Sequence, residues 1–482
     1  MGNNNKKQKP HAIMISFHLQ GHIIPFVNLT LKLASKGFSV TFAHLDFIHH
    51  QISQSQPAQT DIFAGARASG LNISYTTFSD GFPLDFDRSA DFDAYLKFFL
   101  HRFPDKVDEL VGKIISSSPP GSEHFLIADT FSVWPEKISE KYGLVNVSFW
   151  TEPALVFSLY YHLPLLRVNG HVPVNGRRED VGYVPGVESI NTKDFMSYFD
   201  YSEMEMIHTV IFGAFDAVKK ADFVLCNTVQ ELEEEAISAL QQKQRFYAVG
   251  PLFPAKFSVA GSLLPESDCT EWLKSKPFRS VLYVSFGSLA TTDKNVILEI
   301  AGGLLLCGVS FIWVLRPGIV ADSGGGGILP PGFEESTRDR GLIVPWCTQN
   351  LVLSDPAIGG FVTHCGWNSI LESVWCNVPM SCYPLFTDQI TNRKLVVDDW
   401  RVGINLCDGD SITKEEVAEK IGILMSGEKS DELRHEIKKV RKTLQNAVTD
   451  NYGSSEKNFD CFVRDVCDEI VNRCKKDDFP KY

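Results

Sequence analysis

Apolar stretches alternate with amphipathic ones from the start of the chain, in the order that α/β domains produce. Residues 11–17 (HAIMISF) form an apolar run of strand length, residues 23–35 repeat apolar positions at helical spacing before Gly37, and residues 38–43 are again strand-like. A strand, a helix and a second strand in this order predict a βαβ unit, which opens a parallel sheet.

Four further strand-length apolar runs follow in the first half, over residues 124–128, 145–150, 223–226 and 246–249. The pattern weakens after Gly250, in a stretch that contains three prolines and few regular signals. We expect residues 251–270 to be a linker, because prolines and lost periodicity mark the boundaries between domains.

Strand-length runs return in the second half, over residues 280–286, 310–315, 342–345, 360–363 and 379–383. An amphipathic pattern over residues 454–475 predicts a final helix. We therefore predict an α/β protein with two Rossmann-like, doubly wound domains, residues 1–250 and 271–453, that face each other across a cleft. Ligands of such domains bind at the carboxyl ends of the parallel strands.

The composition is that of a globular chain and excludes several classes of partner. Of 482 residues, 44% are apolar and 22% are charged, which excludes long disorder. The 46 Lys and Arg against 59 Asp and Glu give a net charge of −13, which opposes attraction to nucleic acid or to an anionic membrane. The longest uncharged apolar run, residues 301–315, is too short to span a bilayer. Eleven cysteines without a C-x-x-C pair are typical of a reduced cytosolic chain, so we expect a cytoplasmic protein. From the charge and the short apolar run we expect no nucleic-acid partner and no membrane insertion. We also expect a monomer.

One segment combines a strand, a tight turn and the start of a helix. From Gly360 the chain reads GGFVTHCGWNSILESVW, with a helix expected to begin near Asn368. Free backbone N–H groups at Asn368 and Ser369, with the positive end of the helix dipole, suit a phosphate, and His364 could add a donor. Ser369 and Glu372 also fit a capping box, in which Glu372 would only satisfy a backbone N–H. Spacing alone leaves both interpretations open.

The wider segment resembles a known family. Residues 346–389, WCTQNLVLSDPAIGGFVTHCGWNSILESVWCNVPMSCYPLFTDQ, are similar to the signature box of plant secondary-product UDP-sugar glycosyltransferases. The motifs QGHIIPF, YAVGPL, VSFGS and FIWVLRP elsewhere in the chain are also similar to this family. The resemblance implies the GT-B fold, with the acceptor bound mainly by the first domain, the UDP-sugar by the second, and the last helix, within residues 454–482, returning to the first domain.

The resemblance also implies a donor site, whose residues are grouped by the part of the UDP-sugar that they would contact. Uracil and ribose would lie against Trp346, Gln349 and Glu372, with the Trp346 ring stacked on uracil and Glu372 accepting from the ribose hydroxyls. The diphosphate would be surrounded by Ser288, His364, Asn368 and Ser369. The sugar hydroxyls would be met by Thr151, Trp367, Asp388 and Gln389.

The box departs from the common pattern of the family at positions that are not among these ligands: Cys347, Thr348, Asp355, Asn377 and Tyr383 replace Ala, Pro, His, Gly and Trp. In the family a terminal Gln, here Gln389, tends to accompany glucose. We therefore expect UDP-glucose as co-substrate and no further cofactor.

An acceptor hydroxyl needs a base near neutral pH, and histidine is matched to that task. His18 and His22 both lie near the end of the first predicted strand, and without the resemblance they are hard to separate. We favour His22, which we place in the loop directly before the helix, and the resemblance makes it the general base. Asp129, at the end of another strand, matches the family's acid that hydrogen-bonds the histidine; the alternative for Asp129 is a helix cap.

No metal site is expected. Asp-x-Asp triplets at residues 85–87 and 408–410 have the surroundings of solvated loops, and no Cys/His cluster has zinc spacing. The predicted helix N-terminus, with His364, can stabilise a leaving UDP without a metal.

The predicted function is an inverting transfer of a hexose to a hydroxyl of a small apolar or phenolic acceptor, in plant secondary metabolism. Two alternatives remain open: a UDP-sugar epimerase or hydrolase on the same fold, and a nucleotide-sugar sensor without catalysis. Aromatic residues in the first domain favour an acceptor pocket over the epimerase or hydrolase, although core packing explains any single ring as well. They are Phe92, Tyr95, Phe98, Phe99, Phe103, Tyr198, Phe199 and Tyr201. The presence of both His22 and Asp129 counts against a sensor.

Overall fold

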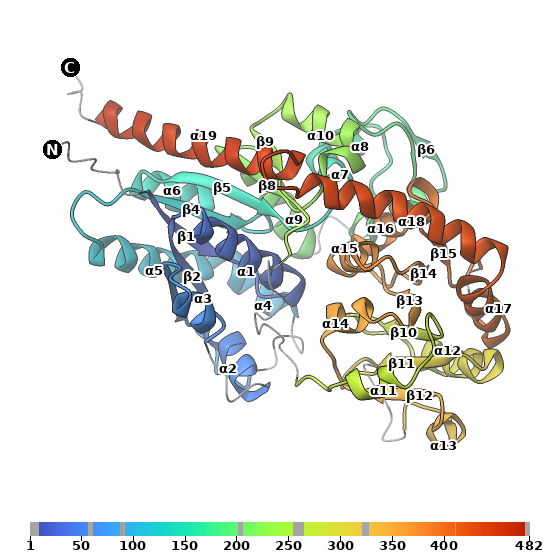
Figure 1. Ribbon diagram of the computed structural model, residues 1–482. Coiled ribbons are helices and arrows are strands. Elements are labelled where there is room, and N and C mark those ends of the chain that lie inside the picture. The colour runs from blue at the N-terminus through green and yellow to red at the C-terminus, as the bar shows by residue number, and fades with distance from the viewer. Residues whose placement is uncertain are drawn as a thin grey trace.

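Two parallel sheets, each covered by helices, form the molecule (Figure 1). The computed structural model describes residues 9–55, 61–86, 88, 92–200, 206–253, 265–320, 327–409 and 411–477. Both sheets are built from short, largely buried strands, as expected where helices cover both faces.

The first sheet has seven parallel strands in the order β3-β2-β1-β4-β5-β8-β9. These strands are β1 (His11–Ile15), β2 (Ser39–Leu45), β3 (Ile73–Phe78), β4 (His124–Asp129), β5 (Val145–Trp150), β8 (Phe223–Cys226) and β9 (Phe246–Ala248). The helices of this half are α1 (Gln20–Ser35), α2 (Asp46–Ser55), α3 (Ala64–Ala68), α4 (Phe92–His101), α5 (Phe103–Ser117), α6 (Pro135–Tyr142), α7 (Ala154–Tyr161), α8 (Leu163–Val168), α9 (Met206–Val218) and α10 (Glu234–Gln241). A small antiparallel pair, β6 (Asp180–Val181) and β7 (Ile190–Asn191), stands apart from the sheet.

The second sheet has six parallel strands in the order β12-β11-β10-β13-β14-β15. These strands are β10 (Val281–Ser285), β11 (Ser310–Val314), β12 (Gly341–Val344), β13 (Ile358–Thr363), β14 (Met380–Cys382) and β15 (Gly403–Asn405). The helices are α11 (Thr270–Lys274), α12 (Lys294–Cys307), α13 (Phe333–Thr337), α14 (Gln349–Ser354), α15 (Trp367–Trp375), α16 (Gln389–Lys394), α17 (Lys414–Met425), α18 (Glu428–Ala447) and α19 (Ser454–Asp477). The α/β class and the two facing parallel sheets predicted from the sequence are confirmed.

The apolar runs of the sequence correspond to the strands of both sheets, with two exceptions. β3 reads ISYTTF and buries only Ile73 fully, because it lies at the edge of the first sheet. β15 has three residues, GIN, at the edge of the second sheet. Neither strand carries the run of apolar residues that the sequence prediction requires, so both were missed.

The last helix, α19, directly follows α18 and lies against the first sheet (Figure 1). The Tyr247 hydroxyl donates to Asp465 of α19 at 2.7 Å, and the Arg473 guanidinium donates to the Leu144 carbonyl at 2.7 Å. The limits of the linker and of the two domains stay predictions.

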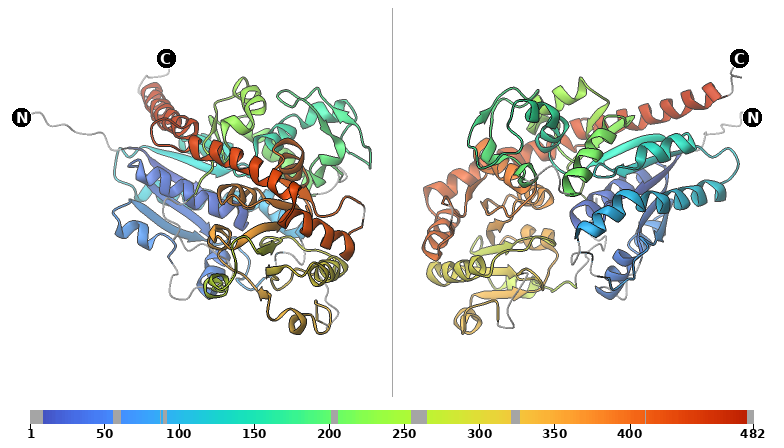
Figure 2. Two further views of the ribbon diagram at one scale, coloured as in Figure 1. Left: turned by 45° about the vertical axis from the view of Figure 1, so that its right-hand side comes forward. Right: turned by 180° about the vertical axis from the view of Figure 1, so that it is seen from behind.

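The two halves also share packing. One apolar core cluster contains Trp150 and Phe157 of the first half together with Trp367 and Ile370 of the second. Seen from two further directions, the two sheets keep separate layers, and the helix pair α18 and α19 extends along both (Figure 2). Within the described ranges, no helix is long and apolar enough to cross a membrane.

Candidate active site

His22 lies inside the first turn of α1, and not in the loop before the helix as the sequence analysis placed it. The backbone N–H of Ile23 donates to the Leu19 carbonyl at 3.0 Å, which closes a helical turn that begins at Gln20. The predicted start was too late because Gln20 and Gly21 are not apolar and therefore do not belong to the periodic pattern. A helical position holds the imidazole more rigidly than a loop would.

Asp129 is the hydrogen-bond partner of His22, although the two residues are 107 positions apart. Asp129 Oδ2 lies 2.8 Å from His22 Nδ1, and the Thr151 hydroxyl lies 3.2 Å from the same nitrogen. The other oxygen, Oδ1, accepts the Phe131 N–H at 3.0 Å. Asp129 caps no helix, since α6 begins only at Pro135. Donation from Nδ1 to the carboxylate leaves Nε2 as the atom that can take a proton.

His18, the rival base, has a different environment. Its ring packs edge-on against Tyr95 and lies 4.3 Å, between centroids, from the ring of Phe17. Burial lowers the pKa of His18 to about 3, and its Nδ1 has no hydrogen-bond partner among the described residues. Of the two histidines, His22 is therefore the one that a carboxylate orients.

The second sheet presents a helix N-terminus whose first turn carries no side-chain cap. β13 ends at Thr363 and α15 begins at Trp367, with Gly366 as its N-cap and no capping side chain. The capping box considered for Ser369 and Glu372 is wrong, because both side chains accept hydrogen bonds from Gln349 Nε2, at 3.0 and 2.8 Å. The N–H groups of this turn are thus not satisfied by a capping side chain, which favours the anion-site interpretation.

Two glycines make room for the His364 ring beside this turn. A Cβ on Gly287 would lie 2.5 Å from His364 Nε2, and a Cβ on Gly366 would lie 2.6 Å from it. Gly287 also has a φ of +72°, which other residues rarely adopt. Burial lowers the pKa of His364 to about 4, so at neutral pH the ring is uncharged and offers one N–H donor. Ser288 directly follows Gly287, in the loop after β10.

A cavity lies between the two halves beside the start of α15, and residues of α1, α14 and α15 form its walls. Its lining includes Gln20, Trp346, Gln349, Asn368 and Glu372. Burial raises the pKa of Glu372 to about 7, and the hydrogen bond from Gln349 opposes this shift. The Asn368 side chain donates to the Gly21 carbonyl at 2.8 Å, which connects the two halves directly beside His22.

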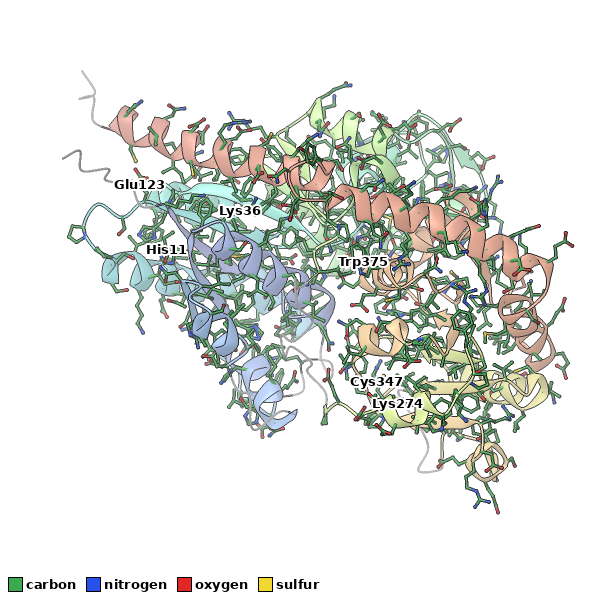
Figure 3. The ribbon with its side chains drawn as sticks, in the orientation of Figure 1. His11, Lys36, Glu123, Lys274, Cys347 and Trp375 are labelled. Atoms are coloured by element: carbon green, nitrogen blue, oxygen red, sulfur yellow. The ribbon has the colours of Figure 1, made fainter. Side chains whose placement is uncertain are left out.

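The segment that carries Trp346 is held by residues that precede the second sheet in the sequence. Cys347 lies next to α11, on which Lys274 is labelled (Figure 3), and the Ser267 N–H donates to the Trp346 carbonyl at 2.9 Å. The Thr348 hydroxyl, at a position where the family usually has Pro, donates to Glu266 at 2.9 Å. These contacts hold the Trp346 segment in place.

Asp388 and Gln389 are buried where α16 begins. Asp388 accepts from the Thr387 hydroxyl at 2.7 Å and from the Asn392 amide at 2.5 Å. Burial raises the pKa of Asp388, and His22 is close enough to lower it through its charge. Gln389 Oε1 accepts the N–H groups of residues 385 and 386 at 3.0 and 3.2 Å, which leaves its NH₂ group for a ligand.

Trp367 has less to offer a sugar than the resemblance implies. Its indole N–H donates to the Asn227 carbonyl at 2.7 Å, across the two halves, and the residue is 3% exposed. Only the backbone N–H of Trp367, in the first turn of α15, remains for a ligand.

The aromatic segments of the first half lie mostly in the core. Tyr95, Phe99, Phe103 and Phe199 are all buried, so core packing explains them better than an acceptor pocket. Phe98 and Tyr198 are half-buried. The side chain of Phe92 and all of Tyr201 lie outside the described residues.

Metal ligands do not gather in the described part of the chain, where no group of three His, Cys, Asp or Glu side chains could hold an ion. Asp85 is exposed and Asp408 forms an ion pair with Lys420. Asp87 and Asp410, which complete the two triplets, lie outside the described residues.

Gln20 is a cavity residue that the sequence analysis did not single out. It is 9% exposed, it lines the cavity with Trp346 and Glu372, and its Oε1 has no partner among the described residues. The signal was present in the motif QGHIIPF, where Gln20 precedes Gly21 and His22.

The chain is similar to known proteins in both sequence and fold. A family model described as UDP-glucoronosyl and UDP-glucosyl transferase matches residues 264–448. The chain is 55% identical to UDP-glycosyltransferase 86A1 of Arabidopsis thaliana, over 97% of this chain and 96% of that protein. It is 33% identical to 7-deoxyloganetin glucosyltransferase of Gardenia jasminoides, over 96% and 99%. The structure of Phytolacca americana UGT2 complexed with UDP-2fluoro-glucose and pterostilbene superposes with a TM-score of 0.77 at 25% identity, covering 95% of this chain and all of that one.

Two parallel sheets that face each other across a nucleotide site define the GT-B class of glycosyltransferases. The chain belongs to the UDP-glycosyltransferase family. It is an enzyme of that family, and UDP-sugars are the donors that the family uses.

Proposed function

We propose that this enzyme transfers glucose from UDP-glucose to a hydroxyl of a small apolar or phenolic acceptor, by a single displacement that inverts the anomeric carbon. The observation that carries the proposal is the 2.8 Å contact between His22 Nδ1 and Asp129 Oδ2. It supplies an oriented base beside a helix N-terminus that suits a diphosphate.

In the proposed reaction the acceptor loses one proton, one bond forms at C1 of the sugar, and one bond at C1 breaks. His22 Nε2 takes the proton of the acceptor hydroxyl while the acceptor oxygen attacks C1 of the sugar. The bond from C1 to the β-phosphate oxygen breaks, and that electron pair leaves with UDP. Asp129 stabilises the imidazolium that forms.

The diphosphate would be bound by hydrogen-bond donors from the second sheet. The N–H groups of Asn368 and Ser369, with the positive end of the helix, supply the anion site, and Ser288 and His364 add side-chain donors. In the same proposal Trp346 stacks on uracil, and Gln349 and Glu372 bind the ribose. The helix N-terminus and these donors can stabilise the leaving UDP, and we propose a metal-independent reaction.

The sugar and the acceptor class are proposed on different grounds. Gln389 with Asp388 favours glucose, and Thr151 with the Trp367 N–H completes the sugar site. One relative is named as a glucosyltransferase, and one solved neighbour holds a fluorinated UDP-glucose with pterostilbene. These names support UDP-glucose and a small acceptor for this chain.

We also propose that the enzyme works as a cytoplasmic monomer in secondary metabolism. All eleven cysteines are free thiols, which suits a reducing compartment. Light scattering of the purified protein and fractionation of cells measure the two properties.

The test mixes the purified enzyme with UDP-glucose, with and without a pool of phenols, and measures UDP release. Acceptor-dependent release is the expected result. Release without the pool would favour a hydrolase, conversion of UDP-glucose to another UDP-hexose without release would favour an epimerase, and binding without either would favour a sensor. The control is the Asp408→Asn variant, which removes the ion pair with Lys420 outside the proposed site. Its acceptor-dependent UDP release should equal that of the wild type.

A further inference from the structure

Arg316 is a buried cation that the proposed mechanism does not use. It follows β11 and is 7% exposed. Its guanidinium donates to three backbone carbonyls: Nε to Gly287 at 3.1 Å, Nη1 to Pro317 at 3.3 Å, and Nη2 to Ala290. Two of these carbonyls bracket Ser288.

The guanidinium has no counter-ion in the described part of the chain, where no carboxylate lies within ion-pair distance of it. Burial removes water from the guanidinium and so lowers the pKa of Arg316. Backbone carbonyls satisfy hydrogen bonds but do not neutralise a full charge. An unpaired buried cation is costly unless a partner of opposite charge reaches it.

The residues around Arg316 connect it to the predicted diphosphate site. Its Nε holds the carbonyl of Gly287, and the backbone of Gly287 packs against the His364 ring. The charge of Arg316 is close enough to His364 to lower the pKa of that ring. The same loop is held again at Thr292, whose N–H donates to the Ile319 carbonyl at 2.8 Å.

We propose that Arg316 is the positioning residue of the diphosphate site: it holds the loop that carries Ser288 against His364, and its positive charge is balanced by the diphosphate of the bound donor. This inference rests on the proposed donor site. Arg316 acts through the loop and through its field, and it does not touch the reacting atoms.

The test compares two ligands that differ only in the diphosphate, UDP and uridine, by titration calorimetry. Arg316→Gln should weaken UDP binding on the order of 10-fold, since a unit charge at several ångströms retains that much effect in a partly buried site. Uridine binding should not change. Arg316→Lys keeps the charge and should bind UDP more tightly than Arg316→Gln does.

The matched control is Arg434→Gln. Arg434 is also 7% exposed and donates to a backbone carbonyl, that of Gly359 at 2.8 Å, but Gly359 lies at the opposite end of β13 from His364. Arg434→Gln should lower the melting temperature and leave the ratio of UDP to uridine affinity unchanged.

Equal losses for UDP and uridine in Arg316→Gln, or no loss for either, would overturn the inference. If Arg316→Gln does not fold, Arg316→Lys serves as the test. A UDP affinity that is unchanged from the wild type supports a role for the positive charge at this position. Equal losses of UDP and uridine affinity overturn the inference. A wild-type enzyme that binds UDP no more tightly than uridine would instead refute the donor site, whatever the variants do.

Discussion

The two sheets have the same parallel construction but present different chemistry at their carboxyl edges. The first sheet places ionisable side chains there, with Asp129 at the end of β4 oriented toward His22 on α1. The second sheet places backbone N–H groups there, at the start of α15, beside a histidine whose pKa burial lowers to about 4. In the proposed mechanism the first edge moves a proton and the second edge holds an anion.

The difference teaches how one fold can separate two tasks. In the proposed mechanism His22 changes its charge during the reaction, and the Asp129 carboxylate lies against its Nδ1. An anion site works best with dipoles that stay fixed, and the turn from Gly366 to Ser369 supplies them. We therefore expect substitutions at the first edge to change turnover and substitutions at the second edge to change donor affinity.

The largest expected effect follows removal of the base. His22→Ala should lower kcat by roughly 10²- to 10⁴-fold and leave UDP affinity unchanged, because the contact of this helix with the donor half uses the Gly21 carbonyl and not the imidazole. Steady-state kinetics and calorimetry measure the two quantities. His18→Ala is the control; loss of transfer in His18→Ala with activity kept in His22→Ala would show that the base is misassigned.

Asp129→Asn tests the orientation of the base. An amide can offer its NH₂ group to Nδ1 and so favour the tautomer with the proton on Nε2, which cannot act as a base. We expect kcat to fall by about 10²-fold or more, with KM for the donor little changed. Thr151→Val, which removes the weaker contact at 3.2 Å, should have a smaller effect; a larger loss in Thr151→Val would contradict the assigned roles.

His22 and Asp129 also show what could be predicted from the sequence and what could not. The apolar runs predicted both sheets, because buried parallel strands are nearly continuous apolar segments. The pairing of His22 with Asp129 joins positions 107 apart, and no spacing rule connects them; only the resemblance implied it. The edge strand β3, with its polar sequence ISYTTF, gave no such apolar signal.

Local spacing was also misleading at the second edge. Ser369 and Glu372 have the spacing of a capping box, but the helix begins at Trp367, and both side chains are bonded by Gln349 from another segment. A capping box requires its first residue to precede the helix. The true start depends on the turn at Gly366, which periodicity does not reveal.

Glu372 should affect affinity and not turnover. Glu372→Ala should weaken UDP binding by about 10-fold, the scale of hydrogen bonds to a charged group, while kcat at saturating donor stays close to that of the wild type. Calorimetry with UDP measures the first quantity. Unchanged UDP affinity in a folded Glu372→Ala variant would contradict the ribose assignment.

The pH dependence of Glu372 sharpens this test. Its pKa in the folded protein is about 7, raised from 4.5 by burial, so the carboxyl ionises as pH rises through neutrality. The carboxylate accepts ribose hydroxyls better than the acid form, so affinity for uridine should increase between pH 5 and pH 8, and Glu372→Gln should remove this increase. Stability changes in the opposite sense: the unfolded chain ionises first, so the stability associated with the protonated group is present below about pH 4.5 and is lost as pH rises through 7.

The smallest expected effect is that of chelation. Because we propose that helix N–H groups, side-chain donors and the nearby charge of Arg316 hold the diphosphate at the second edge, EDTA should leave turnover largely intact. Loss of activity that Mg²⁺ or Mn²⁺ restores would contradict a metal-independent anion site. Asp85 or Asp408 would then be a candidate metal ligand.

The configuration of the product tests most directly whether the two edges act together in one displacement. In the proposed displacement the acceptor oxygen attacks C1 from the side opposite the leaving UDP, so an α-linked UDP-glucose should yield a β-linked glucoside. The anomeric proton coupling of the purified product distinguishes the two configurations. A large coupling, from two axial protons, is the predicted result; a small coupling, from an α-linked glucoside, would contradict the single displacement.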